Sequence, residues 1–204
     1  MATDDTSAAL MDVPELTAGA KKILEVASKL FYQYGIYNVG VDTIAAESGF
    51  TKRTLYDRFG SKDHLVAIHL KARHQRWWAR MEERLAEDPS SPALTFFESY
   101  IRDAETSDRG CAFIIAAAEL AMDHPGYAVV QEHKRMVLDR LTTLISQQRP
   151  QVADADRVAE QVFLLMEGAI VHMGVDGDDR LFASARDMVE RLLSNRSTQL
   201  VDSA

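Results

Sequence analysis

The stretch VDTIAAESGFTKRTLYDRFG, residues 41–60, decides how this chain is organised. Ile44 stands where helical spacing brings an apolar side chain inward, and Gly49 follows where that helix would end. Thr51 is then a good N-cap for a second helix, in which Leu55 is apolar on one side. The pattern predicts two short helices joined by a tight glycine turn, which is the layout of a helix-turn-helix.

Outside this stretch, apolar residues recur with a period near 3.6, and no convincing alternating strand is present. Thr17 and Gly35 are the expected caps of a helix before the motif, and Ser61 is the expected cap of a long helix after it. The stretch EDPSSP, residues 87–92, marks a break. Further helices are expected at about residues 93–106, 111–122, 126–148, 153–173 and 179–194. The sequence therefore predicts an all-α fold.

The composition is that of a soluble globular protein of 204 residues, 47% hydrophobic and 26% charged. One cysteine, Cys111, excludes an internal disulfide framework and suits a reducing compartment. Residues 1–15 lack the pattern of a signal peptide, and we interpret them as a disordered acidic tail. The longest apolar run, CAFIIAAA, is too short to span a bilayer. We expect a cytoplasmic protein with no membrane partner.

The charge is distributed unevenly along the chain. Residues 17–64 carry seven basic and five acidic side chains, a net charge of +2, whereas the whole chain carries −8. The remainder therefore carries −10. Only the N-terminal region is suited to approach a polyanion.

The second helix of the motif exposes polar side chains suited to a DNA groove. Lys52, Arg53, Thr54 and Tyr56 are available on one side of this helix, while Leu55 anchors it from behind. The alternative is an ordinary solvated basic helix face. The glycine turn, the N-cap and the apolar anchor occur together, which favours DNA binding.

The sequence VDTIAAESGFTKRTLYDRFGSKDHL, residues 41–65, resembles the DNA-binding signature of the tetracycline-repressor (TetR) family of bacterial regulators. The preceding AKKILEVASKLFYQYGIYNVG is similar to the first helix of that family. The resemblance implies a helix-turn-helix DNA-binding domain at residues 16–62. It also implies a helical effector-binding and dimerisation domain at residues 63–204, reached through the long helix.

The resemblance also implies roles for individual residues. Lys52, Arg53 and Thr54 match base-reading positions, and Tyr56 and Lys62 match contacts to the DNA backbone. The predicted DNA-binding residues are Thr43, Thr51, Lys52, Arg53, Thr54, Tyr56 and Lys62. Gly40 departs from the family, because many members have Ser or Thr there.

A homodimer is expected because one recognition helix offers few contacts, whereas specific complexes reach Kd values of about 10⁻⁸ to 10⁻¹¹ M. The segment 162–173 is apolar nearly all round, so it needs cover on more than one face. With the last helix it would form half of an intermolecular four-helix bundle, as the resemblance implies. The expected interface residues are Val162, Leu165, Met166, Ala169, Met173, Met188 and Leu192. Burial within one protomer is the alternative.

The resemblance further implies a small-molecule effector bound in the C-terminal body. The candidate lining residues are Trp77, Trp78, Phe97, Phe113, Phe163, Met166 and Glu167. An aromatic and methionine set at helical spacing also fits a plain core. Glu167, in an apolar setting, needs either a ligand or a partner such as arginine.

No metal-ligand spacing, phosphate loop or catalytic motif is present in the sequence, so we predict no metal, no cofactor and no enzyme activity. Cys111 is interpreted as a small buried side chain, and a redox trigger is the second interpretation of this residue.

The leading interpretation is a ligand-responsive transcriptional regulator, a repressor that binds palindromic operator DNA as a homodimer and is released by a small molecule. Activation of transcription stays open, because it depends on where the operator lies. Two competing interpretations are an all-helical enzyme and a small-molecule- or partner-binding protein without DNA function.

Overall fold

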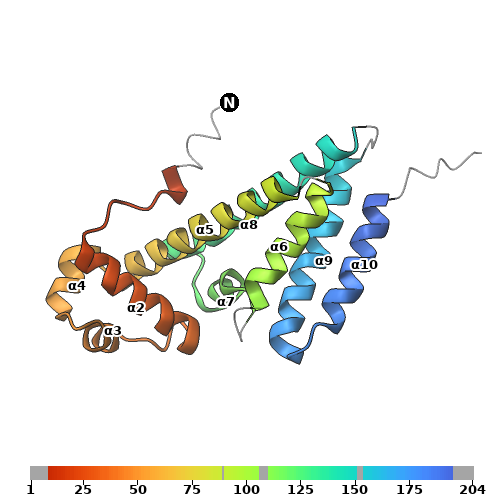
Figure 1. The fold of residues 1–204 in the computed structure, drawn as a ribbon. Coiled ribbons are helices and arrows are strands. Elements are labelled where there is room, and N and C mark those ends of the chain that lie inside the picture. The colour runs from red at the N-terminus through yellow and green to blue at the C-terminus, as the bar shows by residue number, and fades with distance from the viewer. Residues whose placement is uncertain (1–8, 89, 106–109, 151–153, 195–204) are drawn as a thin grey trace, which may run out of the picture. The chain divides into compact units, whose positions relative to one another are not determined.

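The computed structural model describes residues 9–88, 90–105, 110–150 and 154–194, and these residues form helices and turns without a strand (Figure 1). The helices are α2 (Ala18–Tyr34), α3 (Val41–Ser48), α4 (Lys52–Phe59), α5 (Lys62–Glu87), α6 (Pro92–Glu105), α7 (Ala112–Glu119), α8 (Pro125–Gln148), α9 (Ala155–Asp176) and α10 (Arg180–Ser194). The predicted all-α fold with an N-terminal helix-turn-helix is confirmed.

Two helices begin at the capping residues that the sequence indicates. The Thr17 side-chain oxygen accepts a hydrogen bond from the N–H of Ala20 at 3.4 Å, so the first turn of α2 is capped. The Ser61 hydroxyl accepts from the N–H of His64 at 3.0 Å at the start of α5. Helix α9 instead continues to Asp176, beyond the expected end at about residue 173, and Gly177 in the left-handed region ends it. Local chemistry therefore sets these boundaries.

The chain forms two compact units whose boundaries fall within α5 and α8. Unit 1 contains residues up to 78 together with 112–135, and unit 2 contains residues 79–111 and those from 136 onward. The predicted division at residue 62 concerns which function each part carries, and it stays a prediction.

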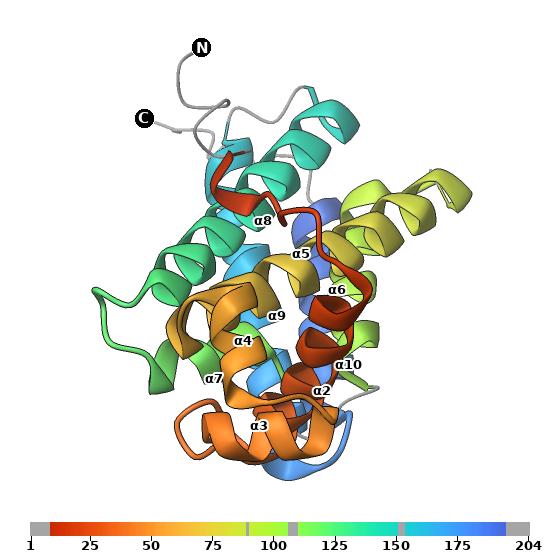
Figure 2. The same ribbon diagram turned by 90° about the vertical axis from the view of Figure 1, so that its left-hand side faces the viewer.

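Unit 1 contains the helix-turn-helix, and its α2, α3 and α4 pack against one another (Figure 2). Ile23, Ile44 and Leu55, one from each helix, are fully buried. The same unit includes α7, because the Glu119 carboxylate accepts a hydrogen bond from the N–H of Tyr37 at 2.8 Å. The loop between α2 and α3 is thus tied to a helix more than 80 residues away in sequence.

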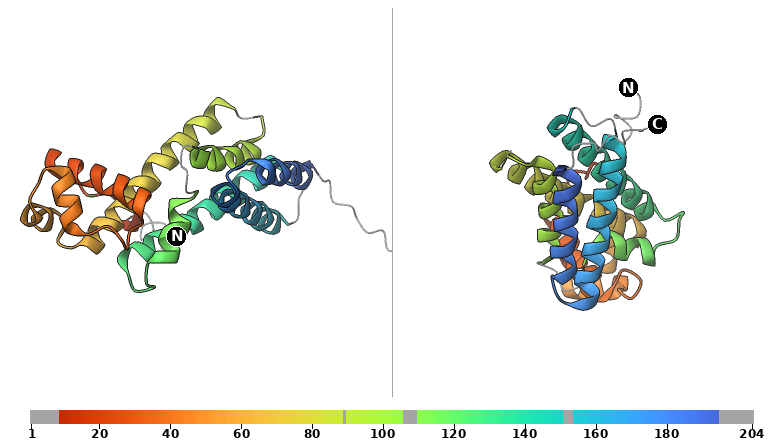
Figure 3. Two further views of the ribbon diagram at one scale, coloured as in Figure 1. Left: turned by 90° about the horizontal axis from the view of Figure 1, so that it is seen from below. Right: turned by 90° about the vertical axis from the view of Figure 1, so that its right-hand side faces the viewer.

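Unit 2 is built on α6, α9 and α10, and α9 and α10 run side by side (Figure 3). The rings of Phe97 and Phe182 stack with centroids 5.7 Å apart, which joins α6 to α10. The Arg186 guanidinium also pairs with Glu98 at 2.6 Å. Aromatic packing and an ion pair therefore hold α10 on α6.

Helix α9 meets the length and apolar composition of a membrane-spanning helix, a criterion that helices of soluble proteins also meet. It does so alone among the described helices. Leu164 on α9 is 69% exposed and Val175 is 71% exposed, so part of its apolar surface is uncovered in the single chain.

The predicted disordered tail, residues 1–15, lies partly outside the described residues. Residues 9–11 form one helical turn, and Met11 is buried. The Gln75 side-chain amide donates to the Met11 carbonyl at 3.2 Å. The end of this segment is therefore packed on α5.

Candidate nucleic-acid interface

The turn between α3 and α4 depends on Gly49. This residue has φ 76° and ψ 17°, in the left-handed region that glycine adopts at little cost. Its N–H donates to the Ala46 carbonyl at 3.3 Å, and the Phe50 N–H donates to the Ala45 carbonyl at 3.1 Å. Both carbonyls at the end of α3 are thereby satisfied, and the chain can start α4 soon afterwards.

Helix α4 begins with a cap that uses two of the predicted DNA-binding residues. The Thr51 side-chain oxygen accepts from the Thr54 N–H at 3.1 Å, and the two threonine hydroxyls lie 2.9 Å apart. Thr51 therefore organises the start of the helix. Thr54 is half-buried and its hydroxyl is engaged with that cap.

The two sides of α4 differ sharply in exposure. Leu55 is 0% exposed and Phe59 is buried, so this side anchors α4 in the unit. The side chain of Arg53 is 91% exposed, and the Asp57 carboxylate one turn later is 3.9 Å away. A solvent-exposed guanidinium on an anchored helix is suited to donate hydrogen bonds to the O6 and N7 atoms of a guanine.

Three further predicted residues are exposed on α3 and α4. Tyr56 is exposed on the same helix. The Lys52 ammonium pairs with Asp42 in the first turn of α3, so this lysine also ties α4 to α3. Thr43 is exposed one residue after Asp42. The structure therefore brings Thr43, Lys52 and Tyr56 to exposed positions on α3 and α4.

Lys62 has an internal contact that sequence reasoning missed. Its ammonium donates to the Ile36 carbonyl at 2.7 Å, and burial lowers its pKa below the ordinary lysine value. Its assignment as a phosphate contact stays a prediction. Gly40 is the N-cap of α3 without a side-chain hydrogen bond, in agreement with its departure from the family pattern.

The predicted effector residues fall into both units. Trp77 and Phe113 are buried in unit 1, and Trp78 is half-buried there. Phe97 and Met166 are fully buried in unit 2. The remaining two, Phe163 and Glu167, are half-buried in unit 2.

One partner of Glu167 is a tyrosine. The Tyr100 hydroxyl donates to the Glu167 carboxylate at 2.6 Å. Burial, followed by the neighbouring Cys111 and Glu167, raises the pKa of Tyr100 well above its ordinary value. Cys111 is buried, as the simpler interpretation of the sequence expects. Tyr100 was missed because its 67-residue separation from Glu167 leaves no local signal.

A buried histidine pair in unit 1 was also missed. The Nδ1 atoms of His74 on α5 and His133 on α8 lie 2.9 Å apart. The His133 ring stacks on Phe113 with centroids 3.6 Å apart and meets Trp77 edge-on. Burial lowers the pKa of His74 to about 4, and it also lowers the pKa of His133, so the pair is uncharged at neutral pH. Apolar residues at helical spacing around His133 were the sequence feature that could have indicated its burial.

The predicted dimer residues divide by exposure. Val162, Met166 and Ala169 are buried within the single chain. Met188 is 48% exposed, and Leu165, Met173 and Leu192 are half-buried. A groove of about 520 Å³ is lined by Gln161, Leu164, Leu165, Met188, Arg191 and Leu192. Leu164 was missed because it lies opposite the face that the sequence pattern favours.

No group of three or more histidine, cysteine, aspartate or glutamate side chains suited to a metal ion occurs within the described part of the chain. The exposed face of α4, with Leu55 buried behind it and Arg53 open to solvent, is the candidate nucleic-acid interface.

A sequence model of the bacterial regulatory proteins of the tetR family matches residues 23–67, which include α3 and α4. The chain belongs to the TetR family. This TetR-family chain is 26% identical over 162 residues to the HTH-type transcriptional regulator TtgR of Pseudomonas putida, covering 73% of this chain and 77% of that protein.

Solved structures extend the likeness beyond the matched region. A TetR-family transcriptional regulator from Streptomyces coelicolor aligns with a TM-score of 0.79 at 27% identity, covering 86% of this chain and 94% of the other. A TetR-type regulator from Streptomyces avermitilis aligns with a TM-score of 0.74 at 27% identity, covering 87% and 97%. The TetR-family chain is accordingly a transcriptional regulator.

Proposed function

We propose that this TetR-family regulator is a repressor that binds palindromic operator DNA as a homodimer and is released by a small molecule. The main support for the proposal is the difference in exposure between the two sides of α4. Leu55 is fully buried while Arg53 is 91% exposed, so a rigidly anchored helix presents a cation outward. The helix lies in the region that matches the family. We place this activity in the cytoplasm.

The homodimer is supported by the uncovered apolar surface of α9 and α10. Leu164 and Met188 are 69% and 48% exposed beside the groove between these helices. Large apolar side chains that cluster in this way mark an interaction surface. A second copy related by two-fold symmetry would cover the same surface on both chains and present two α4 helices to two operator half-sites.

The effector is proposed to act by binding the DNA-incompetent state more tightly. A tenfold difference in affinity between the two states supplies about 1.4 kcal/mol, and a nearly complete switch requires about 5.5 kcal/mol. The hydrogen-bonded pair Tyr100 and Glu167, on α6 and α9, is polar, whereas most of the candidate effector-binding residues are apolar. We therefore propose that this pair binds a polar group of the effector. The relatives described above are transcriptional regulators, which argues against an enzyme.

The DNA proposal is tested by fluorescence anisotropy on the DNA upstream of the gene for this protein. We expect nanomolar binding by the wild type and a loss of about 5- to 150-fold in Arg53→Ala, which corresponds to about 1–3 kcal/mol for one arginine–base contact. Arg102→Ala removes an equal charge from an exposed position on α6 and should bind like wild type. Equal affinities for all three proteins would contradict the role of α4.

The dimer is tested separately by sedimentation velocity. Leu164→Glu places a charge on the uncovered face of α9 and should convert a dimer into a monomer with unchanged helical content. A wild type that sediments as a monomer at micromolar concentration would reject the homodimer.

A further inference from the structure

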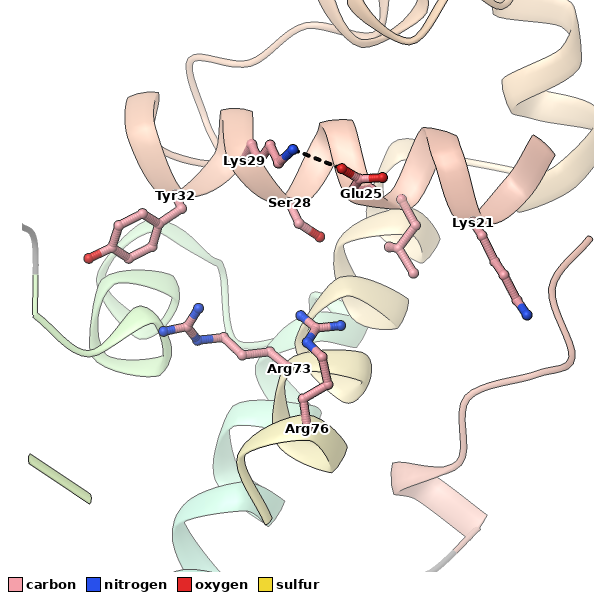
Figure 4. A pocket seen from close by; sticks show the side chains of 8 residues that line it. Lys21, Glu25, Ser28, Lys29, Tyr32, Arg73 and Arg76 are labelled. Carbon is pink, nitrogen blue, oxygen red and sulfur yellow. Dashed lines mark hydrogen bonds and ion pairs between the residues drawn. The ribbon is translucent and has the colours of Figure 1, made fainter. Parts of the chain in front are cut away.

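A basic cavity lies between α2 and α5, within unit 1 (Figure 4). It has a volume of about 560 Å³. It is lined by Lys21, Leu24, Glu25, Ser28, Lys29, Tyr32, Arg73 and Arg76. Four of these eight side chains are cations and one is an anion, in a chain whose net charge is −8. The size is that of a small-molecule site.

The single acid of the cavity is already matched by lysines. The Glu25 carboxylate accepts a hydrogen bond from Lys29 at 2.8 Å, and Lys22 lies 3.7 Å from its second oxygen. These two ammonium groups lower the pKa of Glu25. Lys22 and Lys29 therefore compensate the negative charge of Glu25 without a contribution from the other cations of the cavity.

Arg73 is directed at the cavity without a carboxylate partner among the described residues. Its guanidinium lies over the ring of Tyr32, with the central carbon 5.5 Å from the ring centroid. Figure 4 shows Arg73 and Arg76 extending from α5 towards α2. These two arginines are three residues apart on one helix, so they lie on the same side of it.

Ser28, which lines the cavity, is hydrogen-bonded to the buried His69. His69 is buried, and its Nδ1 lies 2.8 Å from the Ser28 hydroxyl. Burial first, and then the positive charges of Arg73 and Arg76, lower the pKa of His69 to about 3. The imidazole is therefore neutral, and it holds the Ser28 hydroxyl at the cavity wall.

This combination matches a phosphorylated organic molecule. Planar guanidinium groups bind phosphate through paired N–H donors, and the lysine ammonium groups add charge. The Tyr32 ring and Leu24 supply an apolar surface for the organic part of a ligand. Glu25 is compensated by Lys22 and Lys29, so the charges of Lys21 and Arg73 favour a ligand with at least two negative charges.

We propose that this cavity, which we call the α2–α5 anion pocket, binds a small organic phosphate that carries at least two negative charges. Arg73 and Arg76 contact the phosphate oxygens, Ser28 donates a hydrogen bond to them, and Lys21 at the other end of the cavity adds positive charge (Figure 4). The pocket uses α2, against which both helices of the helix-turn-helix pack. It is a site of its own, separate from the residues assigned to base reading and from the effector candidates.

The test is isothermal titration calorimetry of the full chain with inorganic pyrophosphate at constant ionic strength. We expect saturable binding by the wild type and a Kd at least tenfold weaker in Arg73→Gln and in Lys21→Gln. Arg102→Gln removes an equal charge outside the pocket and should bind pyrophosphate like wild type. Two independent pocket variants are used so that a folding defect in one does not decide the result. Circular dichroism checks the fold of each.

Three outcomes would overturn the proposal. The first is the absence of saturable pyrophosphate binding by the wild type. The second is binding by Arg73→Gln and Lys21→Gln that equals that of the wild type. The third concerns DNA binding: both variants bind DNA more weakly and with a shallower salt dependence, and pyrophosphate does not change the DNA affinity of the wild type. The cations would then contact the DNA backbone. Binding of pyrophosphate is measured without DNA, so its failure is distinct from a failure of the repressor proposal.

Discussion

Gly35, at the end of α2, occupies a backbone conformation that is nearly exclusive to glycine, with φ 87° and ψ 153°. A Cβ atom at this position would lie 2.8 Å from a carboxylate oxygen of Glu119. The substitution Gly35→Ala therefore has two effects. It strains the backbone, and it displaces the carboxylate that accepts the Tyr37 N–H.

The magnitude follows from these two contributions. The backbone strain costs about 1–3 kcal/mol. Loss of the hydrogen bond between Tyr37 and Glu119 adds about 1 kcal/mol, so the free energy of unfolding should fall by about 2–4 kcal/mol. Gly49→Ala is the matched control, because Gly49 also has positive φ but nothing lies within 4 Å of its added Cβ. The control should lose only about 1–2 kcal/mol.

The assay is urea unfolding followed by tryptophan fluorescence. Both tryptophans, Trp77 and Trp78, belong to unit 1, so they report on the unit in which Gly35 and Glu119 meet. In a Glu119→Ala background, Gly35→Ala should cost about 1 kcal/mol less than it does in the wild type. Equal costs in both backgrounds would refute the contact between α7 and the α2–α3 loop.

Two further predictions concern buried or partly buried polar groups. Lys62→Met should lower the free energy of unfolding by about 1 kcal/mol, because the Ile36 carbonyl loses its donor, and should make the salt dependence of DNA binding shallower by about one unit. An unchanged salt slope would contradict the phosphate role. For His69, the folded pKa of about 3 lies below the unfolded value of about 6.5, so stability is present at neutral pH and is lost as the pH falls below 6.5. Between about pH 7.5 and 5.0, the free energy of unfolding of His69→Gln should therefore fall by about 2 kcal/mol less than that of the wild type. The expected slope is about 1.4 kcal/mol per pH unit, and urea unfolding at both pH values measures the difference. Identical pH dependence would show that the pKa of His69 is the same in the folded and unfolded protein, and would contradict the lowered pKa.

The features that sequence analysis predicted are those whose causes are local. Thr17, Thr51 and Ser61 cap helices through hydrogen bonds to residues three positions away. Gly49 turns the chain through its own backbone conformation. Such contacts are encoded within a few residues, so spacing and residue type are sufficient to identify them.

The features that the sequence analysis missed depend on distant pairs. Tyr37 and Glu119 are 82 residues apart, and His74 and His133 are 59 apart. A periodic pattern shows which face of a helix is apolar, but it does not show which other helix covers that face. The α2–α5 anion pocket was missed for the same reason. Its cations come from two helices, and only folding brings them together.

We propose that Arg53 reads a base from the anchored helix α4. The most direct measurement is the base preference of the wild type and of Arg53→Ala, determined by selecting each protein against a library of randomised operator half-sites. We expect Arg53→Ala to lose its preference at one base pair in each half-site and to keep its preference elsewhere. An unchanged preference at every position, with affinity lowered uniformly, would contradict base reading and would assign Arg53 to the DNA backbone.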